Sequence, residues 1–190
     1  MGRELEWKYR ADSGKITAIM EKYRGFSPID METSYYDTPD LKLSLHHWTL
    51  RRRMENGVSV CTFKRPLEDG SRGEWEVQCP SIMEGVMKLC QSGAGWELAR
   101  AASGGLVQLC GAKFTRQAAT LVLSGCTVEL ALDHGVLTGR DREVPLCEVE
   151  VEWKSGSEET AKAFAEALAA EFGMEEEPKS KFVRAMALAF

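Results

Sequence analysis

One short run of residues combines groups that bind divalent metal ions with groups that bind phosphate. Glu4, Glu6 and Lys8 occupy alternate positions, and the apolar Leu5 and Trp7 lie between them. Because successive side chains of a β-strand point to opposite faces, the two carboxylates and the ammonium group would share one face. Carboxylate oxygens bind Mg2+ or Mn2+, and lysine and arginine bind phosphoryl oxygens. This face therefore has the chemistry to hold a polyanion together with a metal ion.

The same alternation of charged and apolar residues recurs along the chain, with both signs of charge. Arg51 and Arg53 share one face of a predicted strand, and Glu148, Glu150 and Glu152 share one face of another. Further charged residues in comparable runs are Lys64, Arg72, Glu74, Glu76, Arg116 and Asp133. Several strands of this kind predict an α+β fold built on a closed antiparallel β-barrel of about eight strands. Its lumen would be polar and charged, and helices would pack on its apolar outside.

Hydrophobic periodicity and turn residues predict the elements that position these side chains. Strands are predicted at 3–10, 31–37, 46–54, 58–65, 72–78, 106–115, 117–124, 126–133, 136–142 and 144–153. Helices are predicted from Asp12 or Ser13 to Tyr23, from Ser81 to Cys90, within 93–105, at 158–172 and after Pro178. Asn56-Gly57 favours the positive φ angles of a hairpin turn. Trp7, Trp48 and Trp75 have the parity that faces the helices.

The composition limits the classes of function. The chain has 190 residues, which suits one domain spanning 1–190, with 44% hydrophobic and 28% charged residues. A net charge of -5 argues against a nucleic-acid partner. No stretch approaches the roughly 20 apolar residues that cross a membrane, so no membrane partner is expected. The six cysteines are scattered without a CxxC pair, which predicts free, mostly buried thiols in a reducing cytoplasm. The expected protein is cytoplasmic, and a monomer or homodimer.

These segments together resemble the CYTH, or triphosphate tunnel metalloenzyme, superfamily. Glu4-x-Glu6-x-Lys8 is similar to its ExExK signature. The further matching segments are Tyr35-Tyr36-Asp37-Thr38-Pro39-Asp40, Leu50-Arg51-Arg52-Arg53, Thr62-Phe63-Lys64, Arg72-x-Glu74-x-Glu76, Arg116, Leu132-Asp133-His134-Gly135, Glu148-x-Glu150-x-Glu152 and Ser180-Lys181-Phe182. Their order and approximate spacing fit, and the resemblance covers essentially the whole chain. It implies a tunnel fold, a small triphosphate substrate and a divalent metal ion.

The carboxylates form the predicted metal site. Crowding of Glu148, Glu150 and Glu152 on one strand raises pKa values and destabilises the fold unless a cation lies among them. A strand that faces solvent is the alternative interpretation. The resemblance implies a metal ion between the first strand's ExE and the last strand's glutamates, mainly Glu4, Glu6 and Glu152. The complete predicted set of metal ligands is Glu4, Glu6, Asp133, Glu148, Glu150 and Glu152. Ligand sets made only of oxygen favour Mg2+ or Mn2+ over zinc.

The cations form the predicted substrate site, a clamp for a linear triphosphate. Its residues are Lys8, Arg51, Arg53, Lys64, Arg72, Arg116 and Lys181. A surface salt bridge is the alternative for any single one of them, and Arg52 has the parity that faces outward. The residues predicted to act in catalysis are Lys8, Arg53, Glu74 and Glu76. Glu74 and Glu76 share a face with Arg72, where they would orient cations, bind a second metal ion or position water. Weaker candidates are Lys113, Arg140, Arg142 and Arg184.

The predicted function is metal-dependent hydrolysis of inorganic triphosphate, or a related small triphosphate, inside a charged tunnel. The resemblance leaves open a class IV adenylyl cyclase acting on ATP and a thiamine triphosphatase, although the sequence has no base-recognition signature. A hypothesis of another class is a non-catalytic module that binds polyphosphate or a nucleotide. Carboxylates are present at every position that matches the superfamily, and this favours an enzyme.

Overall fold

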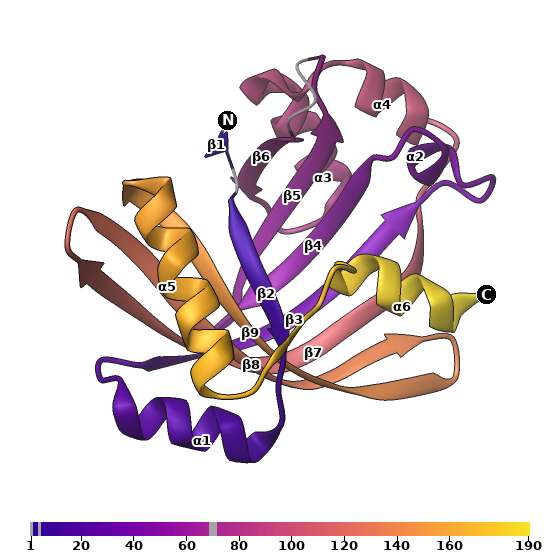
Figure 1. Ribbon diagram of the computed structural model, residues 1–190. Helices are drawn as coiled ribbons and strands as arrows, with labels where there is room; N and C mark the ends of the chain where they lie inside the picture. Colours follow the sequence, from indigo (N-terminus) through magenta and orange to yellow (C-terminus); the bar gives the residue numbers. More distant parts are fainter. Residues whose placement is uncertain (1, 4, 69–71) are drawn as a thin grey trace.

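The computed structural model describes residues 2–3, 5–68 and 72–190, and it is organised around one antiparallel β-sheet (Figure 1). The strands follow one another across the sheet in the order β1-β6-β5-β4-β3-β7-β8-β9-β2-β10. Their bounds are β1 (Gly2–Arg3), β2 (Glu6–Arg10), β3 (Ser27–Asp37), β4 (Thr49–Glu55), β5 (Val58–Pro66), β6 (Arg72–Gln78), β7 (Val107–Leu123), β8 (Cys126–Gly139), β9 (Arg142–Gly156) and β10 (Glu175–Glu176). The strands pair antiparallel, as the sequence pattern predicts.

The prediction of a closed barrel is wrong. Within the described residues the strand order is linear, and no ladder joins the β1 end of the sheet to the β10 end. The N-terminal segment supplies a strand near each end of the sheet, because β1 pairs with β6 and β2 pairs with β9. Alternating side chains determine which face each residue occupies, but they carry no information on whether the two end strands pair. The sheet nevertheless curves strongly, since residues of β2, β4 and β6 line a common cavity.

Two helical layers cover the convex face of the sheet. On one side α1 (Ser13–Lys22) and α5 (Glu158–Glu171) pack on β2, β8 and β9 around Ile19, Leu130 and Val151. On the other side α3 (Ile82–Leu89) and the π-turn η1 (Cys90–Ala94) cover β5 and β6, and α4 (Glu97–Ala102) packs against α3 and η1. As the parity of the strands predicts, the buried Trp75 packs in this second core, and Trp48 and Trp7 pack against the cores of the convex face.

The last helix, α6 (Lys181–Ala189), lies on the opposite, concave face (Figure 1). Its Ala185 packs with Met31 and Phe114, which both line the cavity of the concave face. Ser180 caps the helix by accepting a hydrogen bond from the backbone N–H of Val183 at 3.2 Å. This cap begins the helix at Lys181, whose side chain lines the cavity.

The segment Tyr35–Asp40 has a structural role in the turn between β3 and β4. The carboxylate of Asp37 is 1% exposed and accepts hydrogen bonds from the backbone N–H of Leu43 at 2.8 Å and from Ser44 Oγ at 2.6 Å. These bonds hold the short helix α2 (Lys42–Leu45), which is joined to β4 by residues 46–48. Asp37 therefore sets the approach of the strand that carries Arg51 and Arg53.

Two strands each join segments that the sequence pattern predicts as separate strands. Residues 106–115 and 117–124 form the single strand β7, and residues 126–133 and 136–142 fall largely in β8. Arg116 and Gly135 interrupt the apolar runs, but both lie within the ladder, where Arg116 is opposite Asp133. A Cβ atom on Gly135 would lie 2.2 Å from the carbonyl oxygen of Lys113, so this glycine permits the close approach of two strands.

The prediction of six free thiols is wrong for two cysteines. Cys61 in β5 and Cys79 just after β6 form a disulfide with a Cα–Cα distance of 6.4 Å. Cys90, Cys110, Cys126 and Cys147 are free. The sequence shows no spacing signal for this pair, because the two residues become neighbours only through the register of β5 against β6. Among the described residues, no helix has the length and apolar character needed to cross a membrane.

Candidate functional site

The concave face of the sheet encloses a cavity of about 910 Å3. The predicted site residues that line it are Glu6, Lys8, Arg51, Arg53, Lys64, Arg72, Glu74, Glu76, Arg116, Glu150, Glu152 and Lys181. Asp133 and Glu148 lie beneath its surface, each with a completely buried side chain. Glu4 lies outside the described residues. As expected, Arg52 faces the other side of β4, where it donates a hydrogen bond to Ser59 Oγ at 2.8 Å.

One wall of the cavity is formed by β4, β5 and β6 and carries four cations, Arg51, Arg53, Lys64 and Arg72. Glu74 Oε1 lies 3.4 Å from Lys64 Nζ and 3.8 Å from Arg51 Nη2, so this carboxylate orients two of them. Arg72 Nη2 donates a hydrogen bond to Thr49 Oγ1 at 2.9 Å. Paired cations of this kind present fixed N–H donors to a phosphate without an uncompensated excess of charge.

Arg53 lies in the middle of β4, between these cations and the opposite wall. It forms an ion pair with Glu55, two positions later on the same strand. Burial and the neighbouring Arg51 lower the pKa of Arg53, although Glu55 opposes this shift. An arginine remains charged under such a shift because its ordinary pKa lies far above neutrality. Arg53 is therefore a buried cation whose charge a bound polyanion would stabilise.

Three carboxylates lie side by side at one end of the opposite wall. Glu6 of β2 is the cross-strand partner of Glu152 in β9, and Glu152 is the partner of Glu129 in β8. All three line the cavity. Lys154 Nζ lies 2.9 Å from Glu152 and 3.9 Å from Glu129, and Lys8 Nζ lies 3.5 Å from Glu6. A row of carboxylate oxygens that opens into a cavity is a suitable ligand set for a hard divalent cation.

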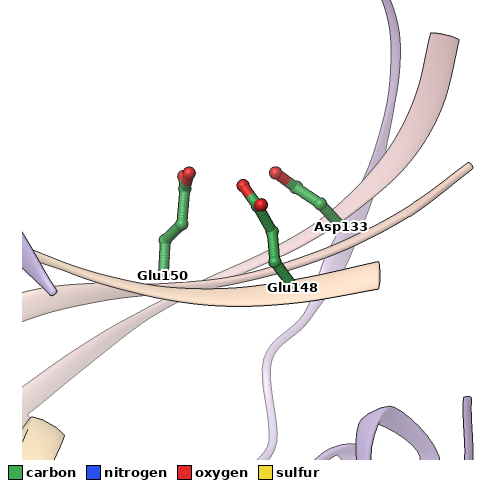
Figure 2. A group of neighbouring side chains, drawn as sticks. All are labelled: Asp133, Glu148 and Glu150. Carbon is green, nitrogen blue, oxygen red and sulfur yellow. The ribbon is translucent and has the colours of Figure 1, made fainter. Parts of the chain in front are cut away.

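A second group of carboxylates lies deeper, between β8 and β9. Figure 2 shows Asp133, Glu148 and Glu150 pointing to the same side of the sheet, and one oxygen of each lies within 4.8 Å of the others. By distance these oxygens could hold a metal ion. Two cations of the cavity already lie among them. Arg116 donates two hydrogen bonds to Asp133, at 2.8 and 2.7 Å, and one to Glu150 at 2.5 Å.

Lys181 is the other cation of this cluster. Its ammonium group lies 2.8 Å from Asp133 and 2.7 Å from Glu150, and it also contacts Glu148. Burial would lower the pKa of Lys181, but Glu150, Asp133 and Glu148 outweigh it and raise this pKa. Burial would raise the pKa of Glu150, but Lys181 and Arg116 outweigh it and hold this pKa well below its usual range. Burial, assisted by the charge of Glu150, raises the pKa of Glu148.

Three functional candidates were not predicted from the sequence. Glu129 belongs to the carboxylate row, Lys154 pairs with that row, and Glu55 pairs with Arg53. Strand parity was a usable signal for Glu129, because it lies on the same face as Asp133, four positions later. Glu55 immediately precedes the Asn56-Gly57 turn, so its position in the sequence did not distinguish it from an ordinary hairpin residue.

By its architecture, the protein is a curved antiparallel sheet around a cavity that both cations and carboxylates line. Residues 2–186 match the CYTH domain family, and the chain belongs to this family.

Several solved structures share this fold. One is the Hippeastrum protein HpAC1, described as a candidate adenylyl cyclase with a dominant triphosphatase activity; it is 20% identical, and the similarity covers 97% of this chain and 95% of that one with a TM-score of 0.68. A candidate adenylate cyclase from Bacillus halodurans is 19% identical, with coverage of 97% and 98% and a TM-score of 0.63. The PH1012 protein from Pyrococcus horikoshii is 21% identical, with coverage of 95% and 98% and a TM-score of 0.57.

Proposed function

We propose that the protein is a metal-dependent hydrolase of inorganic triphosphate or a closely related small triphosphate. One observation carries the proposal: a wall of cations and a row of carboxylates face each other across a common cavity. A cavity with cations alone would suit a binding module. The added carboxylate row supplies what a hydrolase needs in order to hold a divalent metal ion next to the bound phosphate. The Hippeastrum protein HpAC1, which is described as having a dominant triphosphatase activity, also supports a hydrolase.

In this proposal the triphosphate binds along the cation wall. Arg51, Lys64 and Arg72 hold its phosphoryl oxygens, and Lys8, Arg116 and Lys181 contact it from the opposite wall. Arginine supplies forked hydrogen bonds to phosphoryl oxygens, and lysine supplies a compact point charge. Glu74 keeps Lys64 and Arg51 directed into the cavity. Several fixed donors along a linear anion hold it in one orientation, which is the first requirement for in-line attack.

Glu6, Glu152 and Glu129 are the residues that would hold Mg2+ or Mn2+, together with Glu4. Their oxygen donors and their position on the cavity surface fit a hard divalent cation. Asp133, Glu148 and Glu150 are a second possible set, but Arg116 and Lys181 already compensate their charge. Bound in the cavity, the metal ion would neutralise phosphoryl oxygens and favour their reaction with water.

The chemical step is the attack of a water molecule on the terminal phosphorus. The phosphorus–oxygen bond to the leaving diphosphate breaks as the bond to water forms, and a cavity glutamate accepts the proton of the water. Lys8 and Arg53 stabilise the charge that develops on the transferred group, and Glu76, which accepts a hydrogen bond from Thr62 at 3.2 Å, helps to position the water. Catalysis of this type depends on positioning and electrostatics rather than on a covalent intermediate.

The test is orthophosphate release from inorganic triphosphate, ATP and thiamine triphosphate, each with Mg2+, Mn2+ or EDTA. The proposal predicts metal-dependent release that is fastest with inorganic triphosphate. The Arg53→Ala variant should lose about 100-fold or more in turnover, as expected for loss of a transition-state charge partner. Arg52→Ala is the matched control, because Arg52 lies on the opposite face of the same strand.

Three results would contradict the proposal. Release of cyclic AMP and pyrophosphate from ATP would identify a cyclase. Binding of triphosphate without any hydrolysis would identify a binding module. Equal turnover of the Arg52 and Arg53 variants would show that the concave face takes no part in catalysis.

A further inference from the structure

Helix α6 carries a second cation next to Lys181. Arg184 lies three positions later, on the same helical face, and it is not part of the cavity lining. The two residues contact different oxygens of one carboxylate: Lys181 Nζ contacts Glu148 Oε1, and Arg184 Nη2 contacts Glu148 Oε2. The Glu148 side chain is completely buried. This carboxylate therefore links a cation of the cavity to a cation behind it.

Lys181 has three N–H donors and three carboxylate neighbours, which are Asp133, Glu148 and Glu150. Of these neighbours only Glu150 lines the cavity. A phosphoryl oxygen in the cavity can therefore replace Glu150 as a partner of Lys181. Meanwhile the two deeper carboxylates, Asp133 and Glu148, continue to hold the ammonium group in place.

The position of Lys181 then depends on Arg184, the second cation that contacts Glu148. With Arg184 present, three carboxylates face three cations, which are Arg116, Lys181 and Arg184. Without Arg184, two cations would have to compensate three carboxylates in a region that excludes water. Coulomb interactions are strong there, so Lys181 would be drawn toward Glu148 and away from the cavity.

Arg184 is itself fixed by contacts outside the cluster. Its Nη1 lies 3.8 Å from Glu177 Oε2, and the same oxygen accepts a hydrogen bond from Arg10 Nε at 2.8 Å. Glu177 is 5% exposed. The arginine therefore has a defined position between two buried carboxylates, which a positioning role requires.

We propose that Arg184 is a positioning residue for triphosphate binding, which acts through Glu148 to keep the ammonium group of Lys181 at the cavity surface. The inference rests on the proposed function, because Lys181 is assigned there to bind phosphate. Arg184 does not line the cavity, so its effect on an anion bound there would pass through Lys181.

A double-mutant cycle tests this dependence. The affinity for inorganic triphosphate is measured by calorimetry in EDTA, where no metal-dependent hydrolysis occurs, for wild type, Arg184→Ala, Lys181→Ala and the double variant. Arg184→Ala should weaken binding about tenfold, whereas in the Lys181→Ala background it should cause no further loss. Arg184→Lys should restore part of the affinity, since it returns a positive charge near Glu148. In turnover assays with metal, the loss should be in KM rather than in kcat.

Arg142→Ala is the matched control. Arg142 Nη2 donates a hydrogen bond to the carbonyl oxygen of Leu188 at 2.5 Å, so it also attaches α6 to the sheet, but it does not contact Glu148. Thermal unfolding of all variants shows how much each arginine contributes to stability. The inference predicts unchanged triphosphate affinity for Arg142→Ala, even where its melting temperature falls.

The results separate the two proposals. Equal losses of affinity in the Arg142 and Arg184 variants, or additive losses in the double variant, would overturn the positioning role. A wild-type protein that binds triphosphate but does not hydrolyse it with Mg2+ or Mn2+ would refute the proposed function, and the binding cycle would still decide the role of Arg184. A wild-type protein that does not bind triphosphate would overturn both.

Discussion

Replacement of Asp133 by asparagine tests whether the deep carboxylates are compensated by the protein's own cations. Asp133 is completely buried and receives two hydrogen bonds from Arg116, and Lys181 lies 2.8 Å away. The Asp133→Asn change keeps the shape of the side chain but removes the charge that holds both cations. Breaking a buried ion pair from one side costs about 3–5 kcal/mol. For a chain of this size, that corresponds to a fall in melting temperature of roughly 6–20 °C.

The assay is urea denaturation in EDTA, with the free energy of unfolding compared between wild type and Asp133→Asn. EDTA matters because the alternative makes the opposite prediction. If the three carboxylates repelled one another without compensation, removal of one would stabilise the metal-free protein. Glu166→Gln is the control, because Glu166 forms an exposed pair with Lys162 at 3.8 Å and should contribute almost nothing. A free energy of unfolding that is unchanged or increased in Asp133→Asn would show that Arg116 and Lys181 do not compensate the deep carboxylates.

Two further predictions concern stability. The disulfide between Cys61 and Cys79 joins residues 18 positions apart, so the double serine variant should lose about 3 kcal/mol, measured by denaturation with and without a reducing agent; equal stability of the wild type under both conditions would contradict a structural role. Burial would raise the pKa of Glu177, but its hydrogen bonds from Arg10 and from a backbone N–H outweigh this and lower it below 4.5. Its contribution to stability is therefore complete above pH 4.5 and is lost as the pH falls further, so the gap in unfolding free energy between wild type and Glu177→Gln should narrow in acid. Glu171→Gln, at an exposed pair, should show no such gap at any pH.

Strand parity predicted which face of the sheet each side chain occupies, because it is a local property. Each residue's face follows from its position in the strand, so Arg51, Arg53 and Glu150 reached the cavity and Arg52 did not. Strand parity does not determine which strands, far apart in the sequence, pair with one another. The open order of the sheet, the disulfide of Cys61 and the continuous strand β7 all depend on which strands become neighbours.

The alternation of charged residues also did not predict how deeply each side chain is buried. Glu148, Glu150 and Glu152 alternate identically in the sequence, yet Glu148 is buried while Glu152 lines the cavity beside Lys154. The difference arises because α6 covers one end of the concave face and leaves the other end open. Sequence reasoning placed the three glutamates in one metal site, whereas the structure divides them between a buried group and an open row.

The linear order of the sheet also bears on how the chain folds as it is synthesised. Strand β2 is made early, but its ladder partner is β9, where Glu6 pairs with Glu152. The backbone N–H of Glu177 then bonds to the carbonyl oxygen of Lys8 at 2.8 Å, which comes later still. On the ribosome β2 has neither partner until almost all of this sequence has emerged, so the carboxylate row must assemble after translation of β9 rather than strand by strand. A pause in translation ahead of β9 would leave an amphipathic strand exposed to other chains.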